Sequence, residues 1–308
     1  MEETKRLTVD VIIPTYKPGE KYKRLLERLQ TQSYPADKII IINTEKKYYE
    51  ENKFLHLSQM ELIHIKAEEF DHGGTRNAAV LKSDSDLILF LTDDAVPEND
   101  KLIENIVKAF ENKNVAAAYG RQLPAFDCSI IERYTRSFNY PDQSFIKSKA
   151  DMEQMGIKTF FCSNVCAAYR REVYDALGGF PTKTIFNEDM IFTAKLIRAG
   201  YSVAYVADAR VIHSHNLTGI QQFHRNFDLA VSQKQNPEAF EGVKSESEGI
   251  KLVKQTAHYL WSTKHGYLIP KLVYVSGCKF LGYRFGKMYE RLPKRLVVAL
   301  SMNKRYWS

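Results

Sequence analysis

The 308-residue sequence has few of the features that mark fibrous, disulfide-stabilised or membrane-spanning chains. It has only four cysteines, without a CxxC pair or a zinc-ligand spacing, so we expect no disulfide framework and a reducing compartment. No apolar run approaches the ~20 residues that a membrane-spanning helix needs. The 15 glycines and 10 prolines are too few for a collagen-like or low-complexity chain. A globular chain remains.

Charge is unevenly distributed along the chain, although the net charge is only +7. Residues 251–308 contain twelve Lys or Arg and a single acid, Glu290, whereas residues 1–250 have a small acidic excess. A basic tail on a nearly neutral body favours an anionic surface as partner, either a membrane or a nucleic acid. The first residues, MEETKRLTVD, are charged and do not resemble a signal peptide, so we expect a cytoplasmic protein with peripheral membrane contact at most.

Strand-like and helix-like periods alternate over the first 120 residues, which predicts an α/β domain with a largely parallel sheet. Strands are expected at 9–13, 38–42, 61–65, 87–91 and 115–119, and helices at 21–30, 74–81 and from about Pro97. Residues 121–160 lack a sustained period and are expected to form a long excursion over a site. Beyond them we expect regular structure at 160–169, helices at 171–177 and 188–199, strands at 202–206 and 210–212, and mostly helix after His215.

Polar side chains follow four of the predicted strands. They are Thr15 and Tyr16, then Asn43, then the stretch DHGGTRN at 71–77, and finally Asp93 and Asp94. Ligands bind outside the carboxyl ends of the strands in an open α/β sheet, so these residues are the first candidates for a site.

Three groups among the candidates have both a functional and a structural interpretation. Asp93 and Asp94 suit a divalent cation that bridges phosphate oxygens, with an imidazole from His213 or His215, but they could also cap the next helix. The segment from 73 to 77 could bind an anion at a helix start, or form a simple tight turn. Glu188 or Asp189 could act as a general base, or merely complement the helix dipole.

Five motifs in order along residues 7–220 carry a family resemblance. They are VIIPTY, HGGTRN, LFLTDDA, GGF followed by NED, and VIHSH. Together they resemble the signatures of the family 2 inverting glycosyltransferases, which have the GT-A fold, an α/β nucleotide-diphospho-sugar transferase fold. EFDHGGTRN, TDDA in place of DxD, and HSHN are similar to the bacterial rhamnosyltransferase branch. The resemblance implies dTDP-L-rhamnose as donor.

The resemblance also assigns roles to matching positions. Thr15 and Tyr16 match the loop beside the nucleotide base, and Asn43 stands where many members have an aspartate that contacts the pyrimidine. Arg76 and Asn77 match a segment next to the donor, while Asp93 and Asp94 match the last two positions of the metal motif, with Thr92 in place of its first acid. Asp94 with His213 or His215 would hold Mg or Mn. Asp189, with Glu188 beside it, matches the catalytic base.

The tail mixes basic residues with aromatic and aliphatic ones, as in KFLGYRF at 279–285 and KRYW at 304–307. We expect a catalytic domain at 1–220, with a donor half to about 120 and an acceptor half from 121, and a helical region at 221–308. That region either contacts an anionic membrane that carries a lipid-linked acceptor, or packs its aromatics on the catalytic domain. No nucleic-acid motif is present, so we do not expect nucleic-acid binding.

The expected function is therefore inverting transfer of a sugar, L-rhamnose, to a hydroxyl of a lipid-linked or polysaccharide acceptor in bacterial surface-glycan synthesis. Asp189 would be the base, and a metal on Asp94 would stabilise the leaving diphosphate. Two alternatives stay open. A sugar nucleotidyltransferase would show a glycine-rich basic loop after the first strand, where Pro14, Thr15 and Tyr16 stand instead. In a non-enzymatic membrane-associated scaffold, the acidic pairs would only cap helices.

Overall fold

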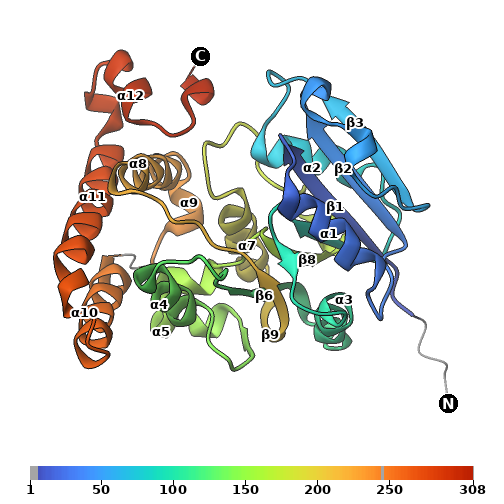
Figure 1. Cartoon of the computed structure of the whole chain (residues 1–308), viewed down its shortest axis with the longest axis horizontal. Coiled ribbons are helices and arrows are strands. Elements are labelled where there is room, and N and C mark those ends of the chain that lie inside the picture. The colour runs from blue at the N-terminus through green and yellow to red at the C-terminus, as the bar shows by residue number, and fades with distance from the viewer. Residues whose placement is uncertain (1–5, 244–245, 308) are drawn as a thin grey trace.

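The computed structural model describes residues 6–243 and 246–307, and a nine-stranded mixed sheet lies at its centre (Figure 1). Four parallel strands form one half: β1 (Val9–Tyr16), β2 (Lys38–Thr44), β3 (Met60–Ile65) and β4 (Leu87–Leu91). The other half contains β5 (Val96–Pro97), β6 (Val115–Leu123), β7 (Phe145–Lys147), β8 (Cys166–Arg170) and β9 (Ser202–Ile212). The order is β3-β2-β1-β4-β8-β6-β9-β5, with β7 also paired to β9.

The strand order places a crevice at the carboxyl end of β1. This strand pairs with β2 on one side and β4 on the other, so the chain winds away from β1 in both directions. β8 is antiparallel to both β4 and β6, which joins the parallel half to the second half. Such a switch in strand order is where open α/β sheets bind ligands.

Helices cover both faces of the sheet because every central strand is apolar on both sides. On one face, α1 (Glu20–Gln30) and α3 (Leu102–Lys108) pack against residues such as Val11 and Leu89. On the other face, α2 (His72–Val80), α6 (Arg171–Ala176) and α7 (Glu188–Arg198) pack against Ile12 and Phe90. The α/β prediction is thereby confirmed.

Three local predictions differ from the structure. The helix expected near Pro97 begins only at Leu102, because Val96 and Pro97 pair with β9 as a short antiparallel strand. Residues 121–160 are more ordered than expected, with α4 (Ile130–Asn139), β7 and α5 (Met152–Met155). The two strands expected at 202–206 and 210–212 form one strand, β9, whose pairing with β6 is interrupted by an irregularity between Gly120 and Arg121.

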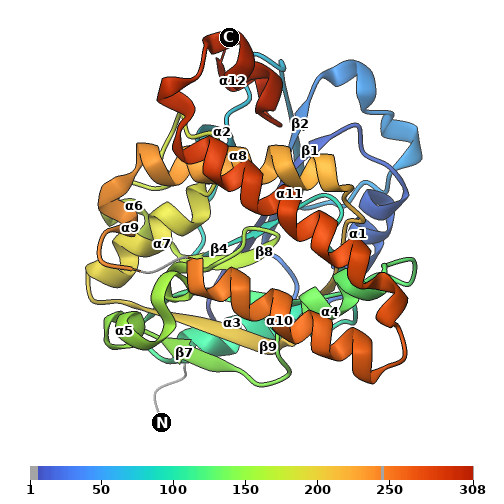
Figure 2. The same ribbon diagram turned by 90° about the vertical axis from the view of Figure 1, so that its left-hand side faces the viewer.

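Within the described residues after β9 the structure has the helices α8 (Gly219–Gln235), α9 (Pro237–Phe240), α10 (Glu246–Ser262), α11 (Ile269–Lys287) and α12 (Lys294–Leu300). Short 3₁₀ turns lie at Lys46–Tyr48, Glu51–Lys53, Ala109–Glu111, Lys149–Asp151, Gly156–Phe160, Gly266–Leu268, Tyr289–Arg291 and Lys304–Trp307. Figure 2 shows α11 crossing α8 on the outer side of the molecule. In the part of the chain that the structure describes, no helix has both the length and the apolar character required to traverse a bilayer.

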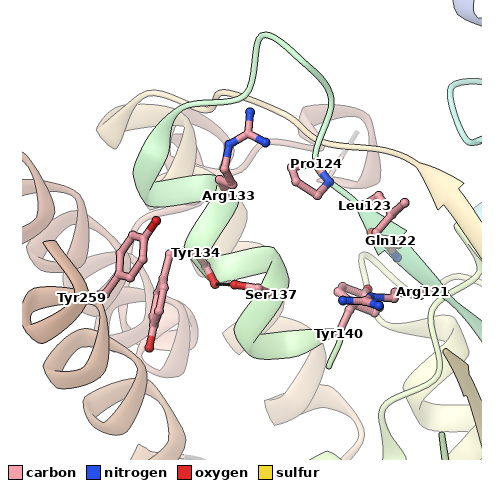
Figure 3. A pocket seen from close by; sticks show the side chains of 9 residues that line it. All are labelled: Arg121, Gln122, Leu123, Pro124, Arg133, Tyr134, Ser137, Tyr140 and Tyr259. Atoms are coloured by element: carbon pink, nitrogen blue, oxygen red, sulfur yellow. Dashed lines mark hydrogen bonds between the residues drawn. The ribbon is translucent and has the colours of Figure 1, made fainter. Parts of the chain in front are cut away.

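The C-terminal helices pack closely on α4 and on one another. Tyr259 of α10 stacks on Tyr134 of α4 with ring centroids 4.5 Å apart, beside a cavity of about 120 Å³ (Figure 3). The backbone of α11 approaches α8 at two glycines: a Cβ on Gly282 would lie 2.2 Å from the Phe223 carbonyl oxygen, and one on Gly286 would lie 2.3 Å from that of Phe227. These positions have no room for a side chain.

Gly282→Ala should therefore destabilise the protein by about 1–3 kcal/mol, because a methyl group would push α11 away from α8. Gly277→Ala on the same helix is the matched control, since a Cβ there meets nothing within 4 Å. The control should gain about 0.5–1 kcal/mol from reduced backbone entropy of the unfolded chain. Urea unfolding of both variants measures the difference, and equal stabilities would contradict the close contact.

Candidate functional site

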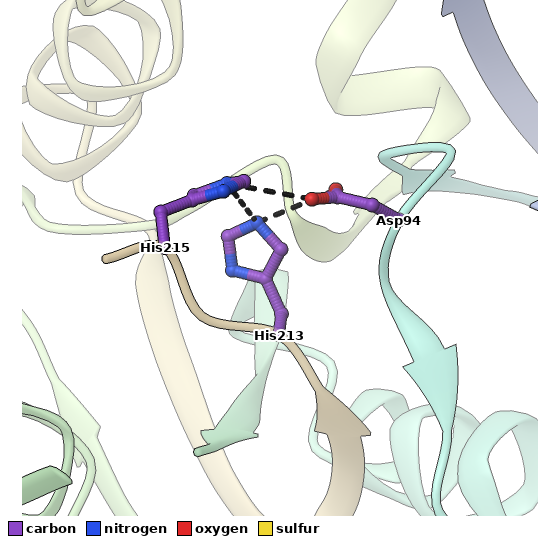
Figure 4. A group of neighbouring side chains, drawn as sticks. All are labelled: Asp94, His213 and His215. Carbon is purple, nitrogen blue, oxygen red and sulfur yellow. Dashed lines mark hydrogen bonds and ion pairs between the residues drawn. The ribbon is translucent and has the colours of Figure 1, made fainter. Parts of the chain in front are cut away.

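Three side chains converge at the carboxyl ends of β4 and β9. Asp94 follows β4, and His213 and His215 follow β9 (Figure 4). The Nε2 atoms of both histidines lie 3.4 Å from the Asp94 carboxylate and 3.1 Å from each other. One ligand atom from each residue lies within 4.8 Å of the others, so both histidines, and not only one of them, belong to the cluster with Asp94.

The neighbours of His213 orient it toward the cluster. Its Nδ1 lies 3.0 Å from Oε1 of Gln122, and this oxygen also accepts a hydrogen bond from the guanidinium of Arg136. Because an arginine only donates, the Gln122 atom is an acceptor and His213 must carry its proton on Nδ1. The other ring nitrogen, Nε2, faces Asp94. Partners of this kind fix the tautomer of metal-binding histidines.

The three side chains of this cluster suit a bound cation. Burial raises the pKa of Asp94, but the interactions with His213 and then His215 outweigh this effect, and the pKa lies below its ordinary value. Burial, followed by His213, lowers the pKa of His215 to about 4. A carboxylate and two imidazoles within ligand distance of one another fit a divalent metal such as Mn²⁺.

Asp93 points the other way and joins β4 to the end of β1. Its Oδ2 accepts hydrogen bonds from Thr15 Oγ1 at 2.6 Å and from the Tyr16 backbone N–H at 3.3 Å. Burial raises the pKa of Asp93 despite these donors. The ring of Tyr16 is 45% exposed and packs edge-on against Tyr48, with the Lys17 ammonium above both rings. This exposed aromatic pair suits a planar ligand.

Asn43 is fully buried beside Thr15 in the sheet. Its Nδ2 lies 3.0 Å from Nδ1 of His64, and its Oδ1 has no partner among the described atoms. An unpaired buried acceptor is costly unless a ligand or water satisfies it.

A second polar group lies at the N-terminus of α7. Arg76 of α2 and Glu188 are both buried, with the guanidinium 3.3 Å from the carboxylate. Asn164 links the two acids: its Nδ2 donates to Glu188 at 3.3 Å, and its backbone N–H donates to Asp189 at 3.2 Å. Tyr169 holds the Asn164 carbonyl by a 2.9 Å hydrogen bond.

The pKa values of the two adjacent acids are shifted in opposite directions. Burial raises the pKa of Glu188, but Arg76 and then His72 outweigh it, so the pKa is lowered overall. Burial, followed by the negative charge of Glu188, raises the pKa of Asp189 to about 7. Asp189 is also partly exposed, whereas Glu188 is buried. A solvent-accessible carboxylate with a pKa near 7 is suited to general-base chemistry.

Asn77 and the glycines around it hold the same region together. The Asn77 amide donates to the Phe180 carbonyl at 2.9 Å and accepts from the Phe180 N–H at 3.0 Å. Gly179 has φ +67° and no room for a Cβ beside Asn77, and a Cβ on Gly73 would lie 1.9 Å from the Pro181 carbonyl oxygen. Asp71 caps α2 by accepting from the Gly74 N–H. The Asn77 side chain thus joins α2 to Tyr174 and Phe180, and the glycines form a packed turn.

The structure brings the candidate residues into three groups: Thr15 and Tyr16 with Asp93; Asp94 with His213 and His215; and Arg76 with Glu188 and Asp189. Sequence reasoning missed Gln122, Arg136 and Asn164, which orient these groups. It also missed Arg225 of α8, whose guanidinium lies 5.0 Å from the centre of the Phe186 ring, next to the start of α7. None of the four belongs to a recognisable motif, and their roles depend on tertiary contacts.

Comparison with known proteins assigns a family. Residues 10–178 match the family model described as Glycosyl transferase family 2. The chain is 40% identical over 306 residues to the O-antigen chain rhamnosyltransferase RfbN of Salmonella typhimurium, covering 98% of this chain and 96% of that protein. It is 41% identical over 303 residues to the O-antigen chain rhamnosyltransferase WbaN of Salmonella anatum, with 97% and 95% covered.

Solved structures share the fold at lower identity. The mannosyltransferase PcManGT from Pyrobaculum calidifontis, in complex with GDP-Man and Mn²⁺, has a TM-score of 0.57 at 16% identity and covers 99% of this chain and 84% of its own. S. aureus TarS 1-349 has a TM-score of 0.52 at 15% identity, with 92% and 91% covered. These likenesses show the fold alone.

Mn²⁺ should raise the melting temperature of the wild-type protein, because it binds only the folded cluster. Asp94→Asn should weaken this binding, and Gln122→Ala should weaken it by about 10- to 100-fold through loss of the His213 orientation. Gln122→Glu should bind like the wild type, since it keeps an acceptor for His213. Thermal shift against Mn²⁺ concentration measures the effect. Asp208→Asn, an exposed acid, is the control; an Asp94→Asn response equal to it would rule out this site.

Proposed function

The chain belongs to glycosyl transferase family 2, and we propose that it transfers L-rhamnose from dTDP-L-rhamnose to a hydroxyl group of a lipid-linked or polysaccharide acceptor in O-antigen assembly. Family 2 enzymes are inverting glycosyltransferases with the GT-A fold predicted from the sequence, and the structural neighbours agree. Family membership decides against the nucleotidyltransferase and the scaffold. The observation that carries the choice of sugar is the 40% identity over nearly the whole chain to O-antigen rhamnosyltransferases.

We assign the proton transfer to Asp189. Its carboxylate accepts the proton of the acceptor hydroxyl while that oxygen forms a bond to the anomeric carbon of the donor. The bond from this carbon to the diphosphate breaks on the opposite face, so the configuration inverts and the nucleotide diphosphate leaves. Glu188 stays ionised beside Arg76 and keeps the proton affinity of Asp189 high. Asn164 holds both acids in place.

The donor would lie along the carboxyl ends of β1, β2 and β4. Tyr16, with Tyr48, offers a stacking surface for the base. Asn43, fully buried at the end of β2, would lie beneath the pyrimidine, and the hydrogen bond from Thr15 to Asp93 holds the end of β1 beside it. Arg76 adds positive charge, while Asn77 secures α2 against Phe180. A divalent metal on Asp94, His213 and His215 would neutralise charge on the leaving diphosphate, and two imidazoles favour Mn over Mg.

We further propose that residues 1–220 form the catalytic domain and that 221–308 hold it at the cytoplasmic face of the membrane. Trp261 of α10 and Phe280 of α11 are 75% and 62% exposed among basic residues, which suits an anionic membrane surface. Residues 244, 245 and 308 of this region lie outside the described ones.

Asp189→Asn should reduce transfer by about 10²- to 10⁴-fold, the usual contribution of a general base, while donor affinity stays unchanged. In the wild type, kcat/KM should rise with pH toward a plateau above about 7, because only the deprotonated carboxylate accepts a proton. Glu188→Gln should move this limb to lower pH, since a neighbouring negative charge is removed. Asp208→Asn is the matched control. An unchanged rate in Asp189→Asn would exclude it as the base.

The donor assignment predicts that dTDP-L-rhamnose, with Mn²⁺ present, stabilises the protein more than UDP-sugars do. The stabilisation should fall when EDTA removes the metal, because the diphosphate loses its counter-charge. A thermal-shift screen of nucleotide sugars with and without Mn²⁺ tests both expectations. Equal or greater stabilisation by a UDP-sugar would overturn the rhamnose donor and leave the family assignment intact.

A further inference from the structure

A cavity of about 530 Å³ lies outside the donor and base sites described above. It is lined by α4 and the residue before it, by the segment from His215 to Gln222, and by one face of α11. His215 belongs both to this lining and to the cluster around Asp94. The cavity therefore adjoins the metal cluster and extends from it toward the C-terminal helices.

Two lysines of α11 face this cavity. Lys271 and Lys279, one turn of α11 on either side of Val275, both line it. Among the described residues neither lysine forms an ion pair within 4 Å. Glu132, the acid in the lining, is already paired with Arg136 at 2.8 Å. Burial lowers the pKa of Lys279, and Arg225 lowers it further against the opposing effect of Glu132. A cation withdrawn from water in this way is stabilised by a bound anion.

The cavity also borders an exposed apolar surface. Tyr274 lines it and is 56% exposed, and Val273, Phe280 and Leu281 on the same helix are 62%, 62% and 50% exposed. A ligand that fits both features has an anionic head and an apolar chain. A free nucleotide lacks the second part, so the chemistry favours an amphiphile over a second nucleotide.

His215 connects this cavity with the donor site, because it lines the cavity and also belongs to the cluster around Asp94. A molecule whose head group lies against Lys279 can therefore extend past His215 toward the donor. That is the direction in which an acceptor must point.

We propose that this cavity binds the diphosphate that links the acceptor glycan to its lipid carrier, with Lys271 and Lys279 as counter-charges. The lipid chain leaves along the exposed apolar face of α11. This inference rests on the proposed function, because the acceptor must also reach Asp189. The inference adds a defined acceptor subsite to that function.

Farnesyl diphosphate, with farnesol as the uncharged counterpart, tests the subsite directly by calorimetry without donor. The wild type should bind the diphosphate more tightly than the alcohol. Lys271→Gln and Lys279→Gln should each weaken it by about tenfold, the usual effect of one hydrogen bond to a charged group. Lys254→Gln, an exposed lysine on α10 that does not line the cavity, removes the same charge and should bind like the wild type.

Three results would overturn the subsite. The first is unchanged affinity in the double variant Lys271→Gln/Lys279→Gln. The second is displacement of farnesyl diphosphate by dTDP with Mn²⁺, which would place it in the donor site. The third comes from sedimentation with phosphatidylglycerol vesicles. If the lysine variants lose vesicle binding to the same extent as they lose binding of farnesyl diphosphate, the lysines are general membrane contacts. If the lysine variants bind farnesyl diphosphate like the wild type but dTDP-L-rhamnose stabilises the protein as expected, the subsite alone is rejected. If the donor screen fails but farnesyl diphosphate binds tightly, the rhamnose donor alone is rejected.

Discussion

The buried ion pair between Arg76 and Glu188 is the interaction on which the catalytic half of the molecule depends. It joins α2, which follows the third strand, to the start of α7, more than a hundred residues later. Removing either charge would leave the other buried without a partner, a cost of several kcal/mol. The Asn77 contacts with Phe180 and the packing of Gly73 on Pro181 join the same two segments. The HGGTRN and NED motifs are therefore parts of one structural unit.

This unit also explains how two neighbouring carboxylates differ in chemistry. Arg76 compensates the charge of Glu188, so Glu188 remains ionised in a buried position. Asp189 forms no ion pair among the described residues, and burial and its negative neighbour Glu188 outweigh the backbone hydrogen bonds and Arg76, so its pKa is raised to about 7. Ion pairing thus separates the pKa values of the two acids, which is the arrangement that the proposed roles of Asp189 as base and Glu188 as its electrostatic support require.

The sequence was sufficient to predict the elements whose signals are local. Apolar runs located β1 to β4, and the polar residues after them marked the crevice, because strand ends in an α/β sheet gather at one edge. The helix expected at Pro97 was wrong because pairing with β9 overrides the proline signal. Gln122, Arg136 and Asn164 could not be found this way, since an amide or guanidinium becomes important only through the partner that folding places beside it.

Packing also places the basic residues of the C-terminal region in different environments, which composition alone could not reveal. Gly282 and Gly286 bring α11 against α8, and Lys279 lies three and seven residues before them, on the same helical face. The contact that forbids a side chain at Gly282 therefore directs Lys279 into the cavity beside His215. Phe280 and Leu281, at other angles around the helix, remain exposed. A single helix thus separates a polar face toward the site from an apolar face toward its surroundings, so charge at Lys279 and charge elsewhere in the tail serve different purposes.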